Sequence, residues 1–172
     1  MNDVAAAQKL PVEELSSIWR WWKSLSDEDR AGRAELRRCG SVAEVAFTAP
    51  YHRLLRWLGS RLKEGDARRV AAIAAVLAHV EAEPEKASSL AKCMARAKGE
   101  GQASIVSDAR FRHLLRNEDP DEMMREVVRV VRQLGRKASV ETLSRDLMLW
   151  DERTRVRWAR DYYEAVPTLE KS

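Results

Sequence analysis

The chain contains few of the residues that cross-link or interrupt a fold. Its 172 residues include only two cysteines, seven glycines and five prolines. Cys39 and Cys93 lie far apart with no other cysteine nearby, so they can form neither a disulfide framework nor a zinc-binding spacing, and we expect two buried thiols. Sparse glycine and proline, with long runs of Ala, Leu, Arg and Glu, predict an almost wholly helical fold.

Long apolar stretches and targeting signals are also missing. The longest apolar stretch, residues 71–80, has ten residues, which is too short to cross a bilayer and suits a buried helix. Residues 1–8 have neither the basic start nor the apolar run of a secretory signal. These absences predict a soluble cytoplasmic protein with no membrane partner.

Signatures of catalysis and cofactor binding are absent as well. His52, His79 and His113 do not have metal-ligand spacing, and no G-x-S-x-G elbow or phosphate-binding glycine loop occurs. The acidic residues at 118–122 could hold Mg²⁺, but at a predicted helix start they are more simply a cap and a complement to the helix dipole. We therefore expect no catalytic residue, no metal site, no cofactor and no enzymatic activity.

Caps and breakers divide the chain into helices. Ser26, Ser107, Asp119 and Ser139 are in N-cap positions, and Pro50 suits the first position of a helix. No convincing alternating strand pattern occurs. We expect helices at about 12–25, 27–39, 51–63, 67–80, 85–98, 108–116, 120–134, 140–150 and 152–165, with a short turn at 42–47.

The most flexible-looking stretch begins at Gly99-Glu100-Gly101-Gln102 and predicts a boundary between lobes. We expect an N-terminal helical lobe at 1–98, a linker at 99–106 and a C-terminal helical lobe at 107–172. The predicted fold is therefore all-α, a two-lobed helical bundle of about eight or nine helices.

Arginine dominates the basic residues, with 23 of the 31, and it recurs at helical spacing. Arg125, Arg129, Arg132 and Arg136 follow one another at steps of four, three and four, which places them in one line on a helix. Neighbouring like charges repel, so this row carries a local cost. Such a row predicts an anion supplied from outside, and the commonest linear anion is a nucleic-acid backbone. The alternative is a solvated basic face.

Three other arginine rows follow the same spacing. Their members are Arg30, Arg33 and Arg37 with Arg38 beside them, then Arg112 and Arg116, and finally Arg153, Arg157 and Arg160. In the last row, Asp161 and Glu164 stand four residues after two of the arginines, so we expect pairs within the helix to neutralise that face. No set of residues resembles a base-reading code, which predicts contact with the backbone rather than with sequence.

The six tryptophans could stack on bases, but most have another explanation. Trp19 and Trp22 share an apolar stripe with Ile18 and Leu25, so we expect them in the core. Trp21 projects elsewhere and is predicted to face a partner protein.

Several motifs, in order along nearly the whole chain, resemble those of the CasB family. The N-terminal motifs are Trp21-Trp22, Arg33-Ala-Glu-Leu-Arg-Arg38 and Pro50-Tyr-His-Arg-Leu-Leu55. The C-terminal motifs are Ser107-Asp-Ala-Arg-Phe-Arg-His-Leu-Leu-Arg116 and the segment from Leu147-Met-Leu-Trp-Asp151 to Trp158-Ala-Arg-Asp-Tyr-Tyr163.

The resemblance implies a bacterial protein that is the non-catalytic small subunit of Cascade, the type I-E CRISPR surveillance complex. Implied partners are the backbone and large subunits of Cascade, a second copy of the chain, the guide RNA (crRNA) and the target DNA. The implied role is to stabilise the R-loop and the displaced strand in antiviral defence.

Together, the arginine rows and the family's basic positions give ten candidate nucleic-acid-binding residues. They are Arg37, Arg38, Arg68, Arg112, Arg116, Arg129, Arg132, Arg136, Lys137 and Arg153. Two other functions remain open from the sequence. One is a pure assembly subunit whose arginines meet acidic faces of other proteins, and the other is a helix-turn-helix regulator that uses residues 140–150 and the helix after them.

Overall fold

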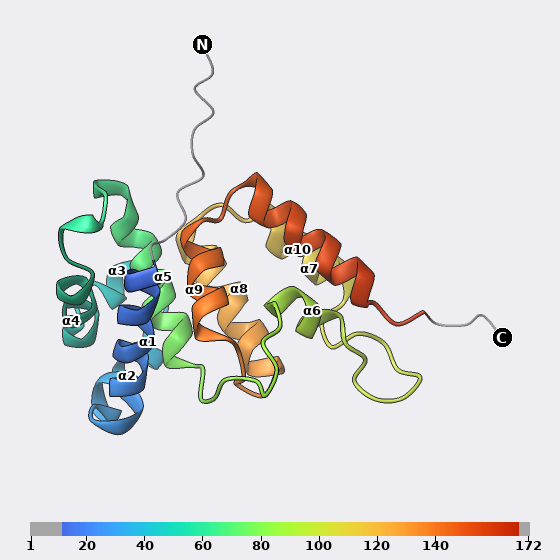
Figure 1. The fold of residues 1–172 in the computed structure, drawn as a ribbon, viewed down its shortest axis with the longest axis horizontal. Coiled ribbons are helices and arrows are strands. Elements are labelled where there is room, and N and C mark those ends of the chain that lie inside the picture. Colours follow the sequence, from blue (N-terminus) through green and yellow to red (C-terminus); the bar gives the residue numbers. More distant parts are fainter. Residues whose placement is uncertain (1–11, 169–172) are drawn as a thin grey trace, which may run out of the picture.

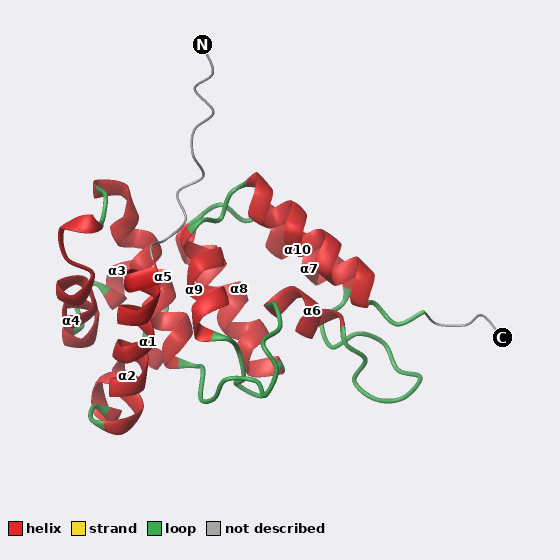
Figure 2. Cartoon of the chain, in the orientation of Figure 1, coloured by secondary structure: helices red, strands yellow, loops and turns green. Residues whose placement is uncertain are grey.

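The computed structural model describes residues 12–168, and helices make up its architecture over that range (Figures 1 and 2). Residues 1–8, which bear on the secretory signal, lie outside the described residues. The described chain contains ten α-helices and two 3₁₀ turns, Gly59–Arg61 and Glu64–Asp66. The helices are α1 Val12–Asp27, α2 Arg30–Arg38, α3 Val42–Val45, α4 Ala49–Leu58, α5 Ala67–Ala78, α6 Leu90–Ala95, α7 Asp108–Arg116, α8 Pro120–Gln133, α9 Val140–Met148 and α10 Glu152–Ala165.

The all-α prediction is confirmed, and three of the predicted caps form. The side chains of Ser107, Asp119 and Ser139 each accept a hydrogen bond from a backbone N–H in the first turn of α7, α8 and α9. The prediction for Ser26 is wrong, because α1 continues past it and Asp29 caps α2 instead. An acidic cap meets the helix dipole more favourably than a hydroxyl does.

Several helix boundaries differ from the prediction. The helix expected at 51–63 ends at Leu58, because Gly59 has a φ of 66° and turns the chain into two 3₁₀ turns. The helix expected at 85–98 shortens to Leu90–Ala95, with Ser89 as its N-cap. The Ala-rich helix ends at Ala78, and the turn expected at 42–47 forms the short helix α3.

Helix α5 lies at the centre of the packing. Its nine consecutive residues 70–78 are buried, and it packs against α2, α3, α4, α8 and α9. At the other end of the molecule α6 packs on α10 (Figure 1). One apolar core runs through these layers. The division into lobes at 99–106 stays a prediction.

The tryptophans of α1 are placed differently from the expectation. Trp21 is 0% exposed and its Nε1 donates to the carbonyl oxygen of Pro50 at 2.9 Å, so it does not face a partner. Trp22 is buried as predicted, but Trp19 is 38% exposed. Because α4 covers the side of α1 that carries Trp21, the buried stripe of α1 is wider than the sequence pattern suggested. Both cysteines are free thiols and are half-buried rather than buried.

Arginine side chains donate hydrogen bonds to carbonyl oxygens at the buried C-terminal end of α5. The Arg33 Nε donates to the carbonyl oxygen of Ala78 at 3.0 Å, and another of its guanidinium nitrogens donates to Val80. Arg37 donates to the same Ala78 oxygen at 2.7 Å, and the Trp22 Nε1 donates to Val80 at 3.0 Å. The last carbonyls of a helix have no partner within it, so these donors satisfy groups that would otherwise be buried unpaired.

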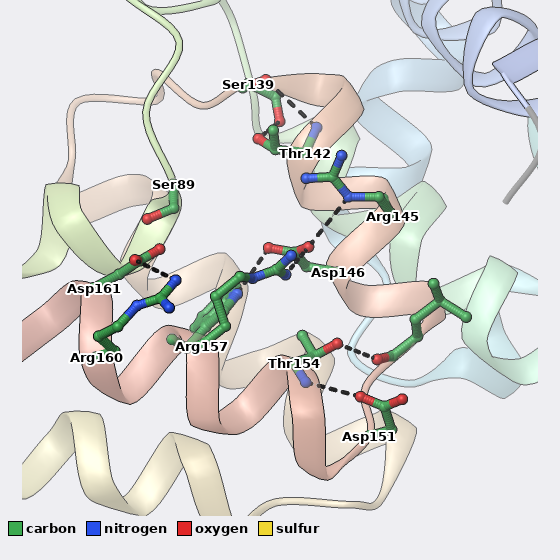
Figure 3. A network of polar contacts seen from close by, with 12 residues as sticks. Ser89, Ser139, Thr142, Arg145, Asp146, Asp151, Thr154, Arg157, Arg160 and Asp161 are labelled. Carbon is green, nitrogen blue, oxygen red and sulfur yellow. Dashed lines mark hydrogen bonds and ion pairs between the residues drawn. The ribbon is translucent and has the colours of Figure 1, made fainter. Parts of the chain in front are cut away.

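A second polar network joins α9 to α10 (Figure 3). Asp146 is 3% exposed and accepts hydrogen bonds from the Trp158 Nε1, at 2.8 Å, and from the Arg157 guanidinium. Arg145 approaches the same carboxylate at 3.6 Å. A buried carboxylate is tolerated only when it is paired in this way.

We expect replacement of Arg33 by Ala to lower the free energy of unfolding by about 2 kcal/mol, because it removes charge-assisted hydrogen bonds to two carbonyls. Urea unfolding measures the change. Arg30→Ala is the matched control on the same helix, since Arg30 is exposed, and its effect should stay within about 0.5 kcal/mol. Equal effects of the two substitutions would contradict a capping role for Arg33.

Candidate nucleic-acid interface

An open groove of about 520 Å³ lies between the end of α2 and the exposed side of α8. It brings together arginines of two rows that are far apart in the sequence. Its lining residues are Arg37, Cys39, His79, Met124, Arg125, Val128, Arg129, Arg132 and Gln133. We call it the α2–α8 groove.

The amphipathic sequence of α8 builds one wall of this groove. Its apolar side chains, which include Met123, Val127 and Val131, are buried against the core and fix the rotation of the helix. Arg125, Arg129 and Arg132 lie on the other side and are exposed. The predicted arginine row is therefore a row in the structure for these three residues.

The groove arginines on α8 are held weakly or not at all by the rest of the chain. Within residues 12–168, Arg132 has no hydrogen bond or ion pair. Arg129 pairs with Glu126 on its own helix at 2.8 Å, and Arg125 donates to the carbonyl oxygen of Gly40 at 3.4 Å. Exposed contacts of this kind contribute at most about 1 kcal/mol, so an incoming anion can replace them.

Arg136 does not belong to the helical row that the spacing predicted. Helix α8 ends at Gln133, and Gly135 and Arg136 have φ values of 71° and 61°, which turn the chain away. The Arg136 guanidinium lies 3.3 Å from the Nδ1 of His79 and 3.7 Å from the Glu81 carboxylate. The row is one residue shorter because the glycine turn starts before its last member.

Arg37 is committed to the fold more strongly than the other groove arginines. Besides its bond to Ala78 it pairs with Glu81 at 3.1 Å, and its side chain is about one-third exposed. It contributes positive charge to the groove from a fixed position, whereas the α8 arginines have only weak contacts or none.

His79 lines the groove, and the charges around it change its pKa. Burial, and after it the positive charges of Arg136, Arg37, Arg132 and Arg33, lower the pKa of His79 from 6.5 to about 4. The imidazole is therefore neutral at physiological pH, and its Nδ1 is free to accept from Arg136. Positive charge therefore outweighs negative charge around this ring, although Glu81 pairs with Arg37 and Arg136.

The other candidates divide into paired and unpaired cations. Arg68 pairs with Asp119 at 3.6 Å and Asp121 at 3.3 Å, and Arg112 pairs with Asp108 at 2.8 Å. The exposed cations for which residues 12–168 provide neither a hydrogen bond nor an ion pair include Arg38, Arg116, Lys137 and Arg153.

Pairing in the last arginine row differs from the expectation. Arg157 pairs with Asp146 on α9 instead of Asp161 on its own helix. Arg160 contacts the adjacent Asp161 at 3.8 Å rather than Glu164. The row is still neutralised in part, but by tertiary contact that helical spacing alone cannot reveal.

The acidic residues at 118–122 act in folding. Asp119 caps α8, Asp121 accepts from the backbone N–H of Val42 at 2.7 Å, and Glu118 pairs with Arg155 at 3.0 Å. Across residues 12–168, no group of three His, Cys, Asp or Glu side chains is placed to hold a metal ion. In the same range no helix is both long and apolar enough to cross a membrane.

The candidate residues predicted from the sequence do not include four polar lining residues of the groove, Cys39, His79, Arg125 and Gln133. Arg125 was visible in the row spacing. His79 and Cys39 give no local signal, because only the packing of α2 and α8 on α5 brings them beside the arginines.

Comparison with known proteins gives one family match and one structural match. The family model described as CRISPR-associated protein Cse2 matches residues 32–163. A chain in the crystal structure of E. coli Cascade bound to a PAM-containing dsDNA target shares the fold, with a TM-score of 0.69 and 16% sequence identity over 86% of this chain and 95% of that one. No curated protein sequence gives a significant match. Apart from Trp21-Trp22, the motifs quoted above all lie within the matched range.

The low pKa of His79 predicts a pH-dependent stability. The unfolded chain takes up a proton at His79 below pH 6.5, whereas the folded chain does so only near pH 4, so acidification favours the unfolded state. The free energy of unfolding should fall by about 2 kcal/mol between pH 7 and pH 5, at about 1.4 kcal/mol per unit once His79 titrates in the unfolded chain alone.

Urea unfolding at a series of pH values tests this. His79→Gln should flatten the slope between pH 7 and pH 5, and the control His113→Gln, at an exposed position on α7, should not. An unchanged slope in the His79 variant would show that another group is responsible.

Proposed function

The chain belongs to the CRISPR-associated Cse2 family, and we propose that it is a non-catalytic small subunit of a type I-E Cascade complex that binds nucleic-acid backbone without sequence preference. The observation that carries the proposal is the α2–α8 groove. Three exposed arginines line this groove, Arg125, Arg129 and Arg132, and all three lie on α8, whose opposite side is buried. An anion can replace the few contacts that these arginines make.

The geometry of α8 suits a sugar–phosphate chain. Arg125 and Arg132 are seven residues apart, which is about 10 Å along the helix at 1.5 Å per residue. Phosphates of one strand follow at about 3.4 Å of duplex axis, so the row can meet about three of them. Guanidinium groups bind phosphate in a planar, bidentate manner, which suits contact with the backbone.

Such contacts can decide whether an R-loop persists. The exchange of a DNA duplex for a guide–target hybrid is nearly balanced in free energy, as is argued for another CRISPR effector, so backbone contacts tip it. Each phosphate neutralised by an arginine releases counterions and makes re-pairing of the two DNA strands less favourable. The proposed role is therefore to stabilise the target or displaced strand in the open state.

The comparisons support the partners of this proposal. The related fold is found in a Cascade complex bound to target DNA, which supports a place beside the other Cascade subunits, the guide RNA and the target DNA. A second copy of the chain within the complex belongs to the same proposal, as do Arg38, Arg116 and Arg153 as further backbone contacts outside the groove.

A pure assembly role has one observation in its favour. Phe47 is 87% exposed and Val156 is 62% exposed, and large apolar side chains on a surface are suited to protein contacts. Phe47 lies just after α3 and Val156 lies on α10, and neither lines the α2–α8 groove. Assembly and nucleic-acid binding can therefore be separated by mutation.

We expect the double substitution Arg129→Ala with Arg132→Ala to weaken target DNA binding by the reconstituted complex without preventing its assembly. Two fewer phosphate contacts should reduce the slope of log affinity against log salt by about 1.5. DNA affinity at several salt concentrations, together with the subunit composition of the purified complex, measures both effects.

The control is Arg30→Ala with Lys92→Ala, which removes the same charge at exposed positions outside the groove. Equal loss of affinity in both double variants would point to net charge rather than to the groove. A variant complex that lacks the subunit would favour the assembly role.

A further inference from the structure

A second open groove, of about 540 Å³, lies between the start of α1 and the end of α4 with the turn that follows it. Helix α4 is at one end of the molecule in Figure 1, away from α8. The lining residues are Val12, Glu13, Ser16, Ser17, Arg20, Trp57, Leu58, Gly59, Ser60 and Arg61. We call it the Trp57 groove.

The fold makes little use of Trp57. Its side chain is 44% exposed, and within residues 12–168 its indole N–H has no hydrogen-bond acceptor. Each of the other five tryptophans donates its indole N–H, and four of the five are buried. The acceptors are Glu83 for Trp19, Pro50 for Trp21, Val80 for Trp22, Asn117 for Trp150 and Asp146 for Trp158. A large aromatic surface with an unused donor is left for a ligand.

Basic and hydroxyl side chains surround this indole. Arg20 is exposed and has no partner within residues 12–168, while Arg61 pairs with Glu13 at 2.9 Å in a solvent-exposed contact. Arg20 is therefore the groove's uncompensated positive charge. Ser16 and Ser60 add hydroxyl groups that can donate to phosphate or sugar oxygens.

From these contacts we infer that the Trp57 groove binds one unpaired nucleotide of a single strand, with the base stacked on Trp57 and the phosphate bound by Arg20. Stacking on an aromatic side chain tolerates any base, because every base has a π face, and a nearby cation holds the backbone. Polar and charged side chains outnumber the three apolar ones in the lining, and the one charge left unpaired is positive, so an anionic nucleotide suits the groove better than a purely apolar side chain does.

Two comparisons within the molecule support this assignment. Trp19 is also half-exposed, but its indole N–H donates to the Glu83 carboxylate, whose charge repels phosphate. The α2–α8 groove has arginines but no Trp, Tyr or Phe in its lining, and its one imidazole, His79, is buried, so it offers no exposed ring for stacking. The Trp57 groove is where an exposed aromatic ring and an unpaired arginine line the same hollow, and it goes beyond the function proposed above because it requires an extruded base.

The test uses the full chain and a fluorescently labelled oligothymidylate, with an unlabelled duplex of the same length as competitor. Trp57→Ala should weaken binding of the single strand about tenfold, as expected for loss of one base–aromatic stack. Trp19→Ala, the matched control at an exposed tryptophan, should change it less than twofold. Arg20→Ala should reduce the salt slope by about 0.7.

Tryptophan fluorescence tests directly whether a base lies on Trp57, whatever the overall affinity for the oligonucleotide. Unlabelled oligothymidylate should quench tryptophan fluorescence in the Trp19→Phe variant and not in the Trp57→Phe variant, and the unlabelled duplex should quench neither. The two Phe variants keep an aromatic ring, and their circular dichroism reports whether the helices remain.

The outcome also separates this inference from the groove on α8. Quenching at Trp57 that persists in the Arg129→Ala with Arg132→Ala variant supports a separate single-strand site, even when that variant binds duplex poorly. Unchanged single-strand affinity in Trp57→Ala overturns the inference and leaves the proposed function standing. If Trp57→Ala instead loses its place in the Cascade complex while binding the oligonucleotide normally, the groove is a protein contact and the inference is wrong.

Discussion

The structure depends on satisfying the carbonyl end of a helix that is buried nearly all round. Helix α5 has no polar face on which its last carbonyls could meet water, so donors must come from the chain itself. Arg33 and Arg37 donate to the carbonyl of Ala78, the last residue of α5, and Arg33 and Trp22 donate to that of Val80 just beyond it, which ties α1 and α2 to this end of α5. Because α8 packs on the same α5, the groove between α2 and α8 is a consequence of this one requirement.

The abundance of arginine therefore serves two purposes that composition alone cannot separate. Arg33 and Arg157 point into the protein, where their several N–H donors satisfy carbonyls and a buried carboxylate. Arg116, Arg132 and Arg153 face solvent without partners in the described chain. A guanidinium group suits both tasks because it stays charged and presents a planar fork, whether the acceptor is a peptide oxygen or a phosphate.

Most local features of the sequence were predictable, apart from the cap at Ser26 and some helix ends, whereas features that depend on distant segments were not. The caps of α7, α8 and α9 and the amphipathic pattern of α8 are written within one or two turns, so they were predictable. The burial of Trp21 depends on α4, and the pairing of Arg157 depends on α9. The α2–α8 groove forms only when α2, α5 and α8 pack together. Single arginines of the groove could therefore be predicted from the sequence, but their arrangement around one groove could not.

Arg136, in the turn after α8, has a left-handed backbone conformation that is unfavourable for a residue other than glycine. Its left-handed backbone costs about 1 kcal/mol relative to glycine, and the preceding Gly135 already supplies one such residue without that cost. The contacts of its side chain to His79 and Glu81 offset part of this strain. In relatives with glycine at position 136, the residues at positions 79 and 81 would have no arginine side chain to contact. We therefore expect positions 79, 81 and 136 to vary together among members of the family.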